Sequence, residues 1–596
     1  MQNNPQDEIF TIGIGGAAGD GVMEAGTNLG LLLRDLGYNV YLSTDYPSLI
    51  RGGHNFTRLS FGRQKIWSDY RGLDVLVALD GKTVGLHSGE MNENSVVFAD
   101  DASVADAEVA ESLKKAKCEM VSLPMLRSAT EIGATAITRN SVALGALCYL
   151  LDLPLEKMTE ILRLIFAEKR MQANVRLAEI GYEYLQKLNF RHSKKIDVGE
   201  NGQLNVGTST TAGAPQHRHG DAEFLDGNTA FAKGLQAAGC DFYFAYPMTP
   251  SSGILHYLAR EQKVAGLKVI QPENEIAVIN MALGAIYAGK RAAIGSATGG
   301  FALMQEALSF AGMAELPLSI AVSQRQAPAT GSPTHSSQSD LRFVLSGGHG
   351  EFPRIVIAPG DLEECFRAGE LSLNLAWKFQ IPVIVLLDKI ISEHSMTGHP
   401  DYDSVSVDKG KLAENPGEDY KRYTFTDDGV SPMAFPGVSN ATVKVTSYEH
   451  DEDGISADAP EDVKKMLDKR FAKIKGIKEN MLGRETIKVY GDSKSENAIV
   501  FFGSTKSAVL EASKHFAKPA KILQIIWMEP FPIEMVVKEL SGAKKIICVE
   551  GNHNAQLAGL IREKTGIEVT DKILKYDSMP FDVIELADQV NKIFNF

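Results

Sequence analysis

Residues 244–255 read FAYPMTPSSGIL, so two prolines flank one threonine at the end of an apolar stretch. Proline fixes its own φ, lacks a backbone N–H and disfavours helix in the residue before it. We therefore expect Tyr246 and Thr249 to be extended, and Ser251 and Ser252 to stand where a helix begins. The stretch predicts a rigid turn that presents the Thr249 hydroxyl and helix-start amides to one point. An ordinary strand-to-helix connection is the alternative.

Two acidic residues precede an almost wholly apolar segment, VIQPENEIAVINMALGAIYAG, at 269–289. Glu273 and Glu275 stand at the start of a helix predicted over 275–288. The helix dipole stabilises a carboxylate there, which alone could explain it. A helix this apolar is expected to be buried nearly all round, so its leading carboxylate should face a cavity or an interface. Buried acids of this kind are candidates for proton transfer.

An arginine follows the predicted strand LPLSIAV and opens a segment rich in Ser, Thr, Gly and Pro, SQRQAPATGSPTHSSQSD, at 323–340. Open α/β sheets bind ligands beyond the carboxyl ends of their strands. The guanidinium of Arg325 suits a carboxylate geometrically. Arg325 is therefore a candidate anion ligand, with a solvated surface arginine as the alternative.

A run of glycines, GIGGAAGDG at 13–21, lies between a predicted strand over 8–14 and a predicted helix. Backbone amides in such a turn can approach a phosphate. The spacing departs by one residue from G-x-G-x-x-G, so a nicotinamide dinucleotide is weakly indicated, and tight strand–helix packing is the alternative. The later segment YPSLIRGGH adds Arg51 as a candidate phosphate ligand.

Length and composition limit the possible functions. A chain of 596 residues should hold about three or four domains. The formal net charge of −14 argues against a nucleic-acid or anionic-membrane surface. No apolar run is long enough to span a bilayer, and MQNNPQDEIF shows no signal-peptide features, so we expect a cytoplasmic protein.

The sequence predicts no metal site in this chain. Its five cysteines are scattered without a C-x-x-C pair, which excludes a ferredoxin-type cluster carried by this chain alone. Gly19-Asp20-Gly21 is similar to the start of the Mg²⁺ motif of thiamine-diphosphate enzymes. The asparagines that follow in that motif are absent, because the corresponding stretch around TDYPSLI contains none.

Strand and helix patterns alternate along most of the chain, which predicts an α/β fold of three doubly wound parallel-sheet domains. The segment around 400–460 is acidic and irregular, and is expected to be disordered or ordered against a partner. The predicted divisions are a first domain over 1–193, a linker over 194–222, a second domain over 223–399, an irregular excursion with a helical connector over 400–480, and a third domain over 481–596.

Together these stretches resemble the 2-oxoacid:ferredoxin oxidoreductases, which use thiamine diphosphate. YPMTPSS is similar to the family motif Y-P-[IV]-T-P-S-S, with Met248 the one departure. QRQAPATGSPTHSSQSDL and GGHGEFPR resemble alpha chains of the two-subunit enzymes, particularly 2-oxoglutarate synthases. The glycine run with YPSLIRGGH resembles the family's gamma domain, and VEGNHNAQLAGLIRE its transketolase C-terminal-like domain. The resemblance covers nearly the whole chain and identifies the second domain as the thiamine-pyrimidine-binding one.

The resemblance implies roles for individual residues. Thr249 and Ser251 would contact the substrate, Arg325 would pair with the substrate carboxylate, and Glu275, rather than Glu273, would hydrogen-bond the cofactor aminopyrimidine. The remaining cofactor contacts are expected to be Tyr246, Pro247 and Thr298 for thiamine diphosphate, and Gly13, Gly15, Gly16, Gly19 and Arg51 for coenzyme A.

The implied reaction is oxidative decarboxylation of a 2-oxoacid with coenzyme A to acyl-CoA, CO₂ and reduced ferredoxin, or its reverse. By resemblance, a beta subunit supplies Mg²⁺ and a [4Fe–4S] cluster in an (alpha-beta)₂ assembly, so this chain alone should be inactive. We expect 2-oxoglutarate as substrate, with pyruvate and branched 2-oxoacids open. A non-catalytic scaffold and a nicotinamide-dependent dehydrogenase are the competing hypotheses.

Overall fold

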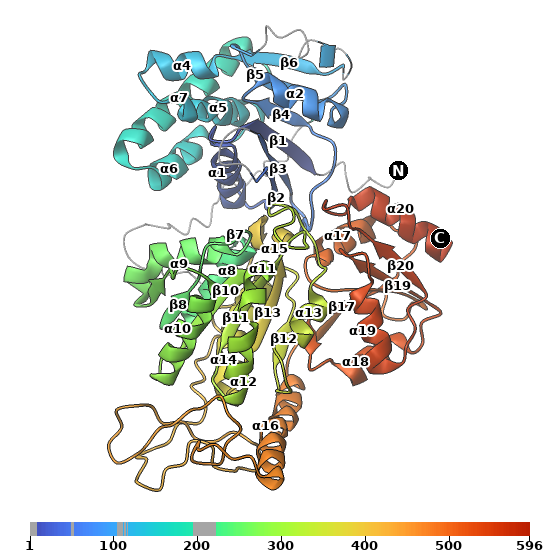
Figure 1. Cartoon of the computed structure of the whole chain (residues 1–596). Helices are drawn as coiled ribbons and strands as arrows, with labels where there is room; N and C mark the ends of the chain where they lie inside the picture. The colour runs from blue at the N-terminus through green and yellow to red at the C-terminus, as the bar shows by residue number, and fades with distance from the viewer. Residues whose placement is uncertain (1–8, 49–52, 104–110, 113–114, 116, 195–221) are drawn as a thin grey trace. The chain divides into compact units, whose positions relative to one another are not determined.

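The chain forms two compact units in the computed structural model (Figure 1). The first comprises Met1–Leu225 with His394–His399, and the second comprises Asp226–Glu393 with Pro400–Phe596. Arg51 and nearly all of the expected linker lie outside the described residues. No helix in the described part of the chain is both long and apolar enough to cross a membrane. The structure describes residues 9–48, 53–103, 111–112, 115, 117–194 and 222–596.

The first unit is built on an eight-stranded mixed sheet of order β6-β5-β4-β1-β3-β2-β14-β7. Strands β1, β4, β5 and β6 are parallel, whereas β3 runs antiparallel to both β1 and β2. The chain returns to this sheet after the second domain, because Thr397 Oγ1 accepts from Val40 N at 3.1 Å. The elements are β1 (Phe10–Ala17), α1 (Val22–Asp35), β2 (Asn39–Asp45), β3 (His54–Gly62), β4 (Val75–Ala78), α2 (Gly81–His87), β5 (Val96–Asp100), β6 (Glu119–Leu123), α4 (Met125–Glu131), α5 (Asn140–Leu150), α6 (Leu155–Ile165), α7 (Glu168–Leu188), β7 (Glu223–Asp226) and β14 (Ser395–Gly398).

The second unit contains a seven-stranded sheet of order β18-β12-β13-β11-β10-β8-β9, parallel except at β18. Its central strands β10, β11 and β13 are wholly buried, as expected of a parallel sheet covered by helices on both faces, whereas the edge strand β9 is partly exposed. The elements are α8 (Gly227–Ala237), β8 (Phe242–Phe244), α9 (Ser252–Ala265), β9 (Lys268–Ile270), α10 (Glu275–Tyr287), β10 (Ala292–Ala297), α11 (Thr298–Leu303), α12 (Gln305–Met313), β11 (Ser319–Gln324), α13 (Leu341–Ser346), β12 (Ile355–Ile357), α14 (Leu362–Phe379), β13 (Val383–Asp388), α15 (Lys389–Glu393) and β18 (Trp527–Glu529).

The C-terminal sheet has the order β15-β17-β16-β19-β20 and is parallel except at β15. Strand β18 leaves this part of the chain to pair with β12, and one apolar cluster runs through both sheets. The α/β class with several parallel-dominated sheets is confirmed. The elements are α16 (Pro460–Met481), β15 (Ile487–Gly491), β16 (Asn497–Phe501), α17 (Thr505–Ala512), β17 (Lys521–Ile525), α18 (Ile533–Leu540), β19 (Lys545–Glu550), α19 (Gln556–Thr565), β20 (Asp571–Leu574) and α20 (Val583–Phe594).

The excursion at 399–459 contains no helix or strand, yet it packs on its own chain. Arg422 is buried and donates from Nη2 to Glu315 O at 2.8 Å and from Nη1 to Gln380 Oε1 at 3.1 Å. Gln380 Nε2 in turn donates to Ser431 O at 2.5 Å. Polar contacts within its own unit therefore order the excursion.

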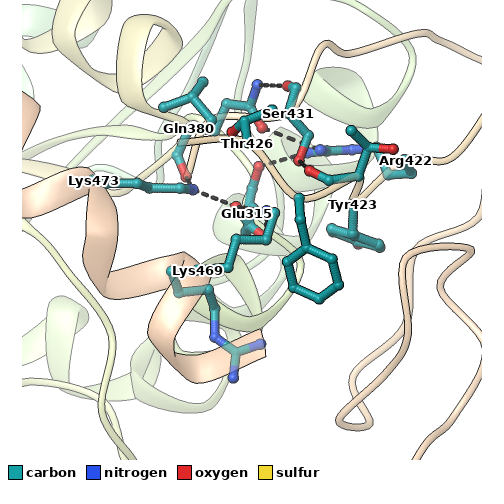
Figure 2. Close-up of polar contacts among 12 residues, drawn as sticks. Glu315, Gln380, Arg422, Tyr423, Thr426, Ser431, Lys469 and Lys473 are labelled. Carbon is teal, nitrogen blue, oxygen red and sulfur yellow. Dashed lines mark hydrogen bonds and ion pairs between the residues drawn. The ribbon is translucent and has the colours of Figure 1, made fainter. Parts of the chain in front are cut away.

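Helix α16 is held by a buried charge cluster around Glu315 (Figure 2). Lys469 Nζ lies 2.7 Å from Glu315 Oε1, and Lys473 forms an ion pair with Oε2. Burial disfavours the Glu315 charge, but Lys473, Lys469 and Arg422 outweigh it and hold the pKa well below its usual range. Burial also lowers the pKa of Lys473 to about 7, although Glu315 opposes the shift. One carboxylate thus neutralises part of a three-cation cluster.

Glu315→Gln should lower the free energy of unfolding strongly, because the buried ammonium groups of Lys469 and Lys473 lose the carboxylate with which they pair. Breaking a buried pair from one side costs about 3–5 kcal/mol. Urea unfolding at neutral pH measures the difference. Glu306→Gln changes an exposed acid on the neighbouring helix α12 and is the control. Equal stabilities of the two variants would contradict this account.

Lys473 should make stability depend on pH. Its pKa is about 7 in the folded chain against an ordinary 10.5, so between these values the unfolded chain binds the additional proton. The Lys473 contribution to the free energy of unfolding should therefore become more favourable as pH rises through that window. Lys473→Met should remove this part of the rise, as measured by urea unfolding across the window. Parallel pH profiles of the native chain and the variant would count against it.

Candidate functional site

The turn after β8 is fixed by side chains on both sides. Asn228 Nδ2 donates to Pro250 O at 2.7 Å, and the Thr249–Pro250 peptide is cis. Ser251 does not cap α9 as expected, since its hydroxyl donates back to Met248 O at 2.8 Å and no side chain caps that helix. The hydroxyl satisfies the turn carbonyl instead of a helix amide. Ser251 is buried, and Asn228 is a supporting residue that the sequence analysis missed.

Arg325 and Thr249 come together. Arg325 follows β11 directly, is only 9% exposed, and donates from Nη1 to Thr249 O at 2.7 Å. Burial lowers the pKa of Arg325, and no acid counteracts the shift. A buried guanidinium without a carboxylate partner among the described residues is prepared to receive an anion.

Glu275 is the first residue of α10 and is 3% exposed, whereas Glu273 is exposed. The helix cap is Asn274, whose side chain accepts from Ala277 N at 2.9 Å, so Glu275 is not needed for capping. Glu275 Oε1 is buried without a hydrogen-bond partner. A Cβ at Gly300 in α11 would lie 2.6 Å from this oxygen, so glycine there leaves room for the carboxylate.

Thr298 follows β10 and is buried beside Asp340, a residue to which the sequence analysis gave no role. Burial raises the pKa of the Asp340 carboxyl, and the Thr298 hydroxyl partly opposes the shift. Asp340 stands at the cap position of α13 but makes no capping bond, and its backbone N–H donates to Gln324 Oε1 at 3.0 Å. The position of Asp340 at the end of the SSQSD segment, which follows Arg325 in the sequence, is the feature that could have identified it as a site candidate.

One side of α10 is open, so the expectation that this helix is buried all round is wrong. Ile276 is 52% exposed and Met281 43%, and Leu303 of α11 is also exposed. Tyr246 and Pro247 are exposed as well. Apolar groups therefore lie on the surface next to the buried Glu275. Of the two surroundings predicted for this carboxylate, a cavity or an interface, this exposure favours the interface.

The glycines of the first unit have packing roles. Strand β1 continues to Ala17, beyond the predicted strand end, so Gly13, Gly15 and Gly16 lie in the strand. A Cβ at Gly13 would lie 2.6 Å from the Phe56 ring, and a Cβ at Gly15 would lie 2.5 Å from the Thr83 methyl. Close side-chain packing alone accounts for these glycines.

The turn before α1 holds a carboxylate of its own. Asp20 Oδ2 accepts from Ala17 N at 3.0 Å and pairs with Arg139 at 2.8 Å. Gly19 and Gly21 have φ of 100° and 74°, which favours glycine, and Gly21 precedes α1 without a side-chain cap. Of the glycines predicted to bind a phosphate, those in the turn at 18–21 are the ones that packing in β1 does not explain.

The second unit thus places a buried acid and a guanidinium that has no carboxylate partner among the described residues along one sheet edge. The preceding strands of Thr249, Thr298 and Arg325 are the neighbours β8, β10 and β11. This arrangement can hold a carboxylate substrate beside a group that exchanges a proton with Glu275.

Comparison with known proteins decides the family. Residues 233–469 match the family described as "Pyruvate flavodoxin/ferredoxin oxidoreductase, thiamine diP-bdg", and residues 11–184 match "Pyruvate ferredoxin/flavodoxin oxidoreductase". A 2-oxoacid:ferredoxin oxidoreductase subunit alpha of Sulfolobus sp is 32% identical over 616 residues, covering 97% of this chain and 96% of its own. The chain belongs to the 2-oxoacid:ferredoxin oxidoreductase family, as an alpha subunit. This membership favours the catalytic subunit over the scaffold and the dehydrogenase.

Two further relatives carry a substrate in their names. The 2-oxoglutarate synthase subunit KorA of Methanothermobacter thermautotrophicus is 30% identical over 62% of this chain and 99% of its own. The solved 2-oxoglutarate:ferredoxin oxidoreductase from Magnetococcus marinus, with 2-oxoglutarate, coenzyme A and succinyl-CoA bound, covers 98% of this chain and 99% of its own chain. Its TM-score is 0.83 and its sequence identity 28%. The oxidoreductase fold therefore extends along almost the whole chain.

If Glu275 exchanges a proton as we expect, Glu275→Gln should abolish turnover of the complex assembled with a beta subunit, because the amide keeps the size of the side chain but loses the carboxylate. Steady-state reduction of a dye by the complex measures it, and gel filtration checks assembly. Glu273→Gln is the matched control and should keep native turnover. Activity lost in the control and kept in Glu275→Gln would assign the role to the other glutamate.

Proposed function

We propose that this chain, assembled with a beta subunit, catalyses oxidative decarboxylation of 2-oxoglutarate with coenzyme A, or the reverse carboxylation. The products would be succinyl-CoA, CO₂ and reduced ferredoxin. The observation that carries the proposal is the buried Arg325, which lacks an acidic partner and is joined to Thr249 at 2.7 Å. The names of the KorA relatives and of the Magnetococcus marinus enzyme support 2-oxoglutarate.

The residues present fit the pyrimidine end of thiamine diphosphate. Glu275 has a buried oxygen without a hydrogen-bond partner, and Gly300 keeps the space beside it open. When bound, the cofactor supplies the nucleophile that attacks the 2-oxo carbon. Glu275 would hold a hydrogen bond to the pyrimidine ring, and Thr298, Tyr246 and Pro247 would line the rest of the site.

Arg325 and Thr249 would bind and orient the substrate. The guanidinium pairs with the 2-oxoacid carboxylate, and its bond to the Thr249 carbonyl fixes the direction in which the remaining N–H groups point. Burial strengthens this attraction, because water competes less for the guanidinium. Ser251 holds the turn shape through Met248 O, so its contribution to substrate binding would be indirect.

A partner chain would supply the remaining chemistry. In the described part of the structure no group of three or more His, Cys, Asp and Glu could hold a metal ion. We propose that a beta subunit carries the Mg²⁺ and the [4Fe–4S] cluster and covers the apolar surface at Ile276, Met281 and Leu303 in an (alpha-beta)₂ assembly. Exposed apolar side chains that gather on one surface are typical of protein–protein interaction sites.

We propose that coenzyme A is bound by the first unit at the turn before α1, with Arg51 as a phosphate ligand. The amides near Gly19 and Gly21 are the remaining candidates, because Gly13, Gly15 and Gly16 serve packing in β1. Asp20 pairs with Arg139, so its negative charge is compensated.

The test of function is co-purification with the native beta subunit, followed by dye reduction with a panel of 2-oxoacids and coenzyme A. We expect the highest kcat/KM with 2-oxoglutarate. A preference for pyruvate or a branched 2-oxoacid would keep the reaction class and change the substrate, whereas no reduction with any 2-oxoacid would refute the function.

In the same assay, Arg325→Met should raise the KM for the 2-oxoacid while the coenzyme A requirement stays native. Losing one charge-assisted hydrogen-bonding group costs on the order of 1.5–3 kcal/mol. Arg342→Met removes the Arg342 guanidinium, which pairs with Glu563 at 2.5 Å on the surface, and serves as the control. A shift of the coenzyme A curve instead of the 2-oxoacid curve would contradict the role of Arg325.

A further inference from the structure

Gln338 is 2% exposed, and its side chain forms four hydrogen bonds. Its Nε2 donates to Asp388 Oδ2 at 3.2 Å, at the end of β13, and to Phe502 O at 3.1 Å, after β16. Its Oε1 accepts from Thr505 Oγ1 at 2.8 Å and from Gly551 N at 2.9 Å. One side chain therefore joins the end of a pyrimidine-domain strand to two strand ends of the C-terminal sheet.

The backbone of the same residue is also bound to the C-terminal sheet. Gln338 N donates to Gly551 O at 2.7 Å, and Gln338 O accepts from Asn552 Nδ2 at 3.2 Å. The next residue is held as well, because Gln556 Nε2 donates to Ser339 O at 2.5 Å. All these partners belong to the C-terminal domain, residues 487–594.

The loop at 326–340 depends on such anchors because it contains no helix or strand, apart from one isolated bridge. Its two halves are tied together on both sides of Arg325. Gln324 Oε1 accepts from Asp340 N at 3.0 Å, and Gln326 N donates to His335 O at 3.1 Å. The backbone around Arg325 is thus bonded to the half of the loop that Gln338 holds.

We propose that the C-terminal domain is a positioning element for the 2-oxoacid site, and that Gln338 is the positioning residue through which it holds loop 326–340 and Arg325. The inference rests on the proposed role of Arg325. Misplacing a binding group by about 1 Å can cost on the order of a hundredfold in rate. Gln338 can therefore influence substrate binding through the position of Arg325, although it lies several residues away from it.

Gln338→Ala, compared with Gln524→Ala, tests the inference in the complex with the beta subunit. Gln524 is a matched control because it is also a buried glutamine between the two domains, donating to Glu364 Oε2 at 2.6 Å, but it does not touch the loop. Gln338→Ala should raise the KM for 2-oxoglutarate about tenfold with little change in the coenzyme A requirement. Gln524→Ala should lower stability and leave that KM native.

Hydrogen exchange of the full-length chain supplies a readout that does not depend on turnover. Backbone amides of 326–340 should exchange faster in Gln338→Ala and at the native rate in Gln524→Ala. Thr505→Val removes only one bond to Gln338 and should give a smaller change in the same direction, which keeps the test available if Gln338→Ala does not fold.

The outcomes separate this inference from the proposed function. Equal KM values for the native complex and Gln338→Ala, or equal KM shifts in Gln338→Ala and Gln524→Ala, would overturn the positioning role. If the native complex failed to reduce the dye with every 2-oxoacid tested, the proposed function would be refuted. The hydrogen-exchange measurement would still report whether Gln338 holds the loop.

Discussion

Parallel pairing of β8, β10 and β11 brings the carboxyl ends of three strands to one edge of a sheet. Each strand is followed by one residue of the site, and a fourth, Glu275, begins the helix after β9. These residues are separated by up to 76 positions in sequence, as Thr249 and Arg325 are, yet Arg325 Nη1 donates to the backbone carbonyl of Thr249 at 2.7 Å. Because successive parallel strands all point the same way, loops that carry chemistry collect at one end.

The second unit uses buried charge as well as apolar packing to hold its parts. Lys506 of α17 lies 2.5 Å from Glu364 and also pairs with Asp361. The carboxylate of Glu315 pairs with two lysines of α16, and its backbone carbonyl accepts from Arg422 of the excursion. Removing charges from water is costly, so these pairs stabilise only the arrangement in which every member has its partner. They therefore specify how α16 and the C-terminal sheet dock on the seven-stranded sheet of the second unit.

The first unit shows that a glycine-rich motif can have two origins. Gly13 and Gly15 are required because the Phe56 ring and the Thr83 methyl lie on the strand, whereas Gly19 and Gly21 adopt positive φ in the turn. Both requirements exclude a side chain, so both leave the same residue type in the sequence. Only the neighbours in space separate the glycines that pack from those that shape a turn.

Local sequence indicated the alternation of strands and helices and the extent of α10, and it singled out Thr249, the pair Glu273 and Glu275, and Arg325 as site candidates. These follow from periodicity, proline geometry and apolar patterning, which act within a few residues. The preference for Glu275 over Glu273 came from the family resemblance. Tertiary structure alone decided that β14 and β18 join sheets far from their neighbours in sequence, that the acidic excursion packs on its own chain, and that one side of α10 is exposed. It also decided the hydrogen-bond partners of Asn228 and Gln338 and the burial of Asp340, because a polar side chain acquires its surroundings only when distant segments meet. Hydrogen bonds and burial across such distances leave no local periodicity to read.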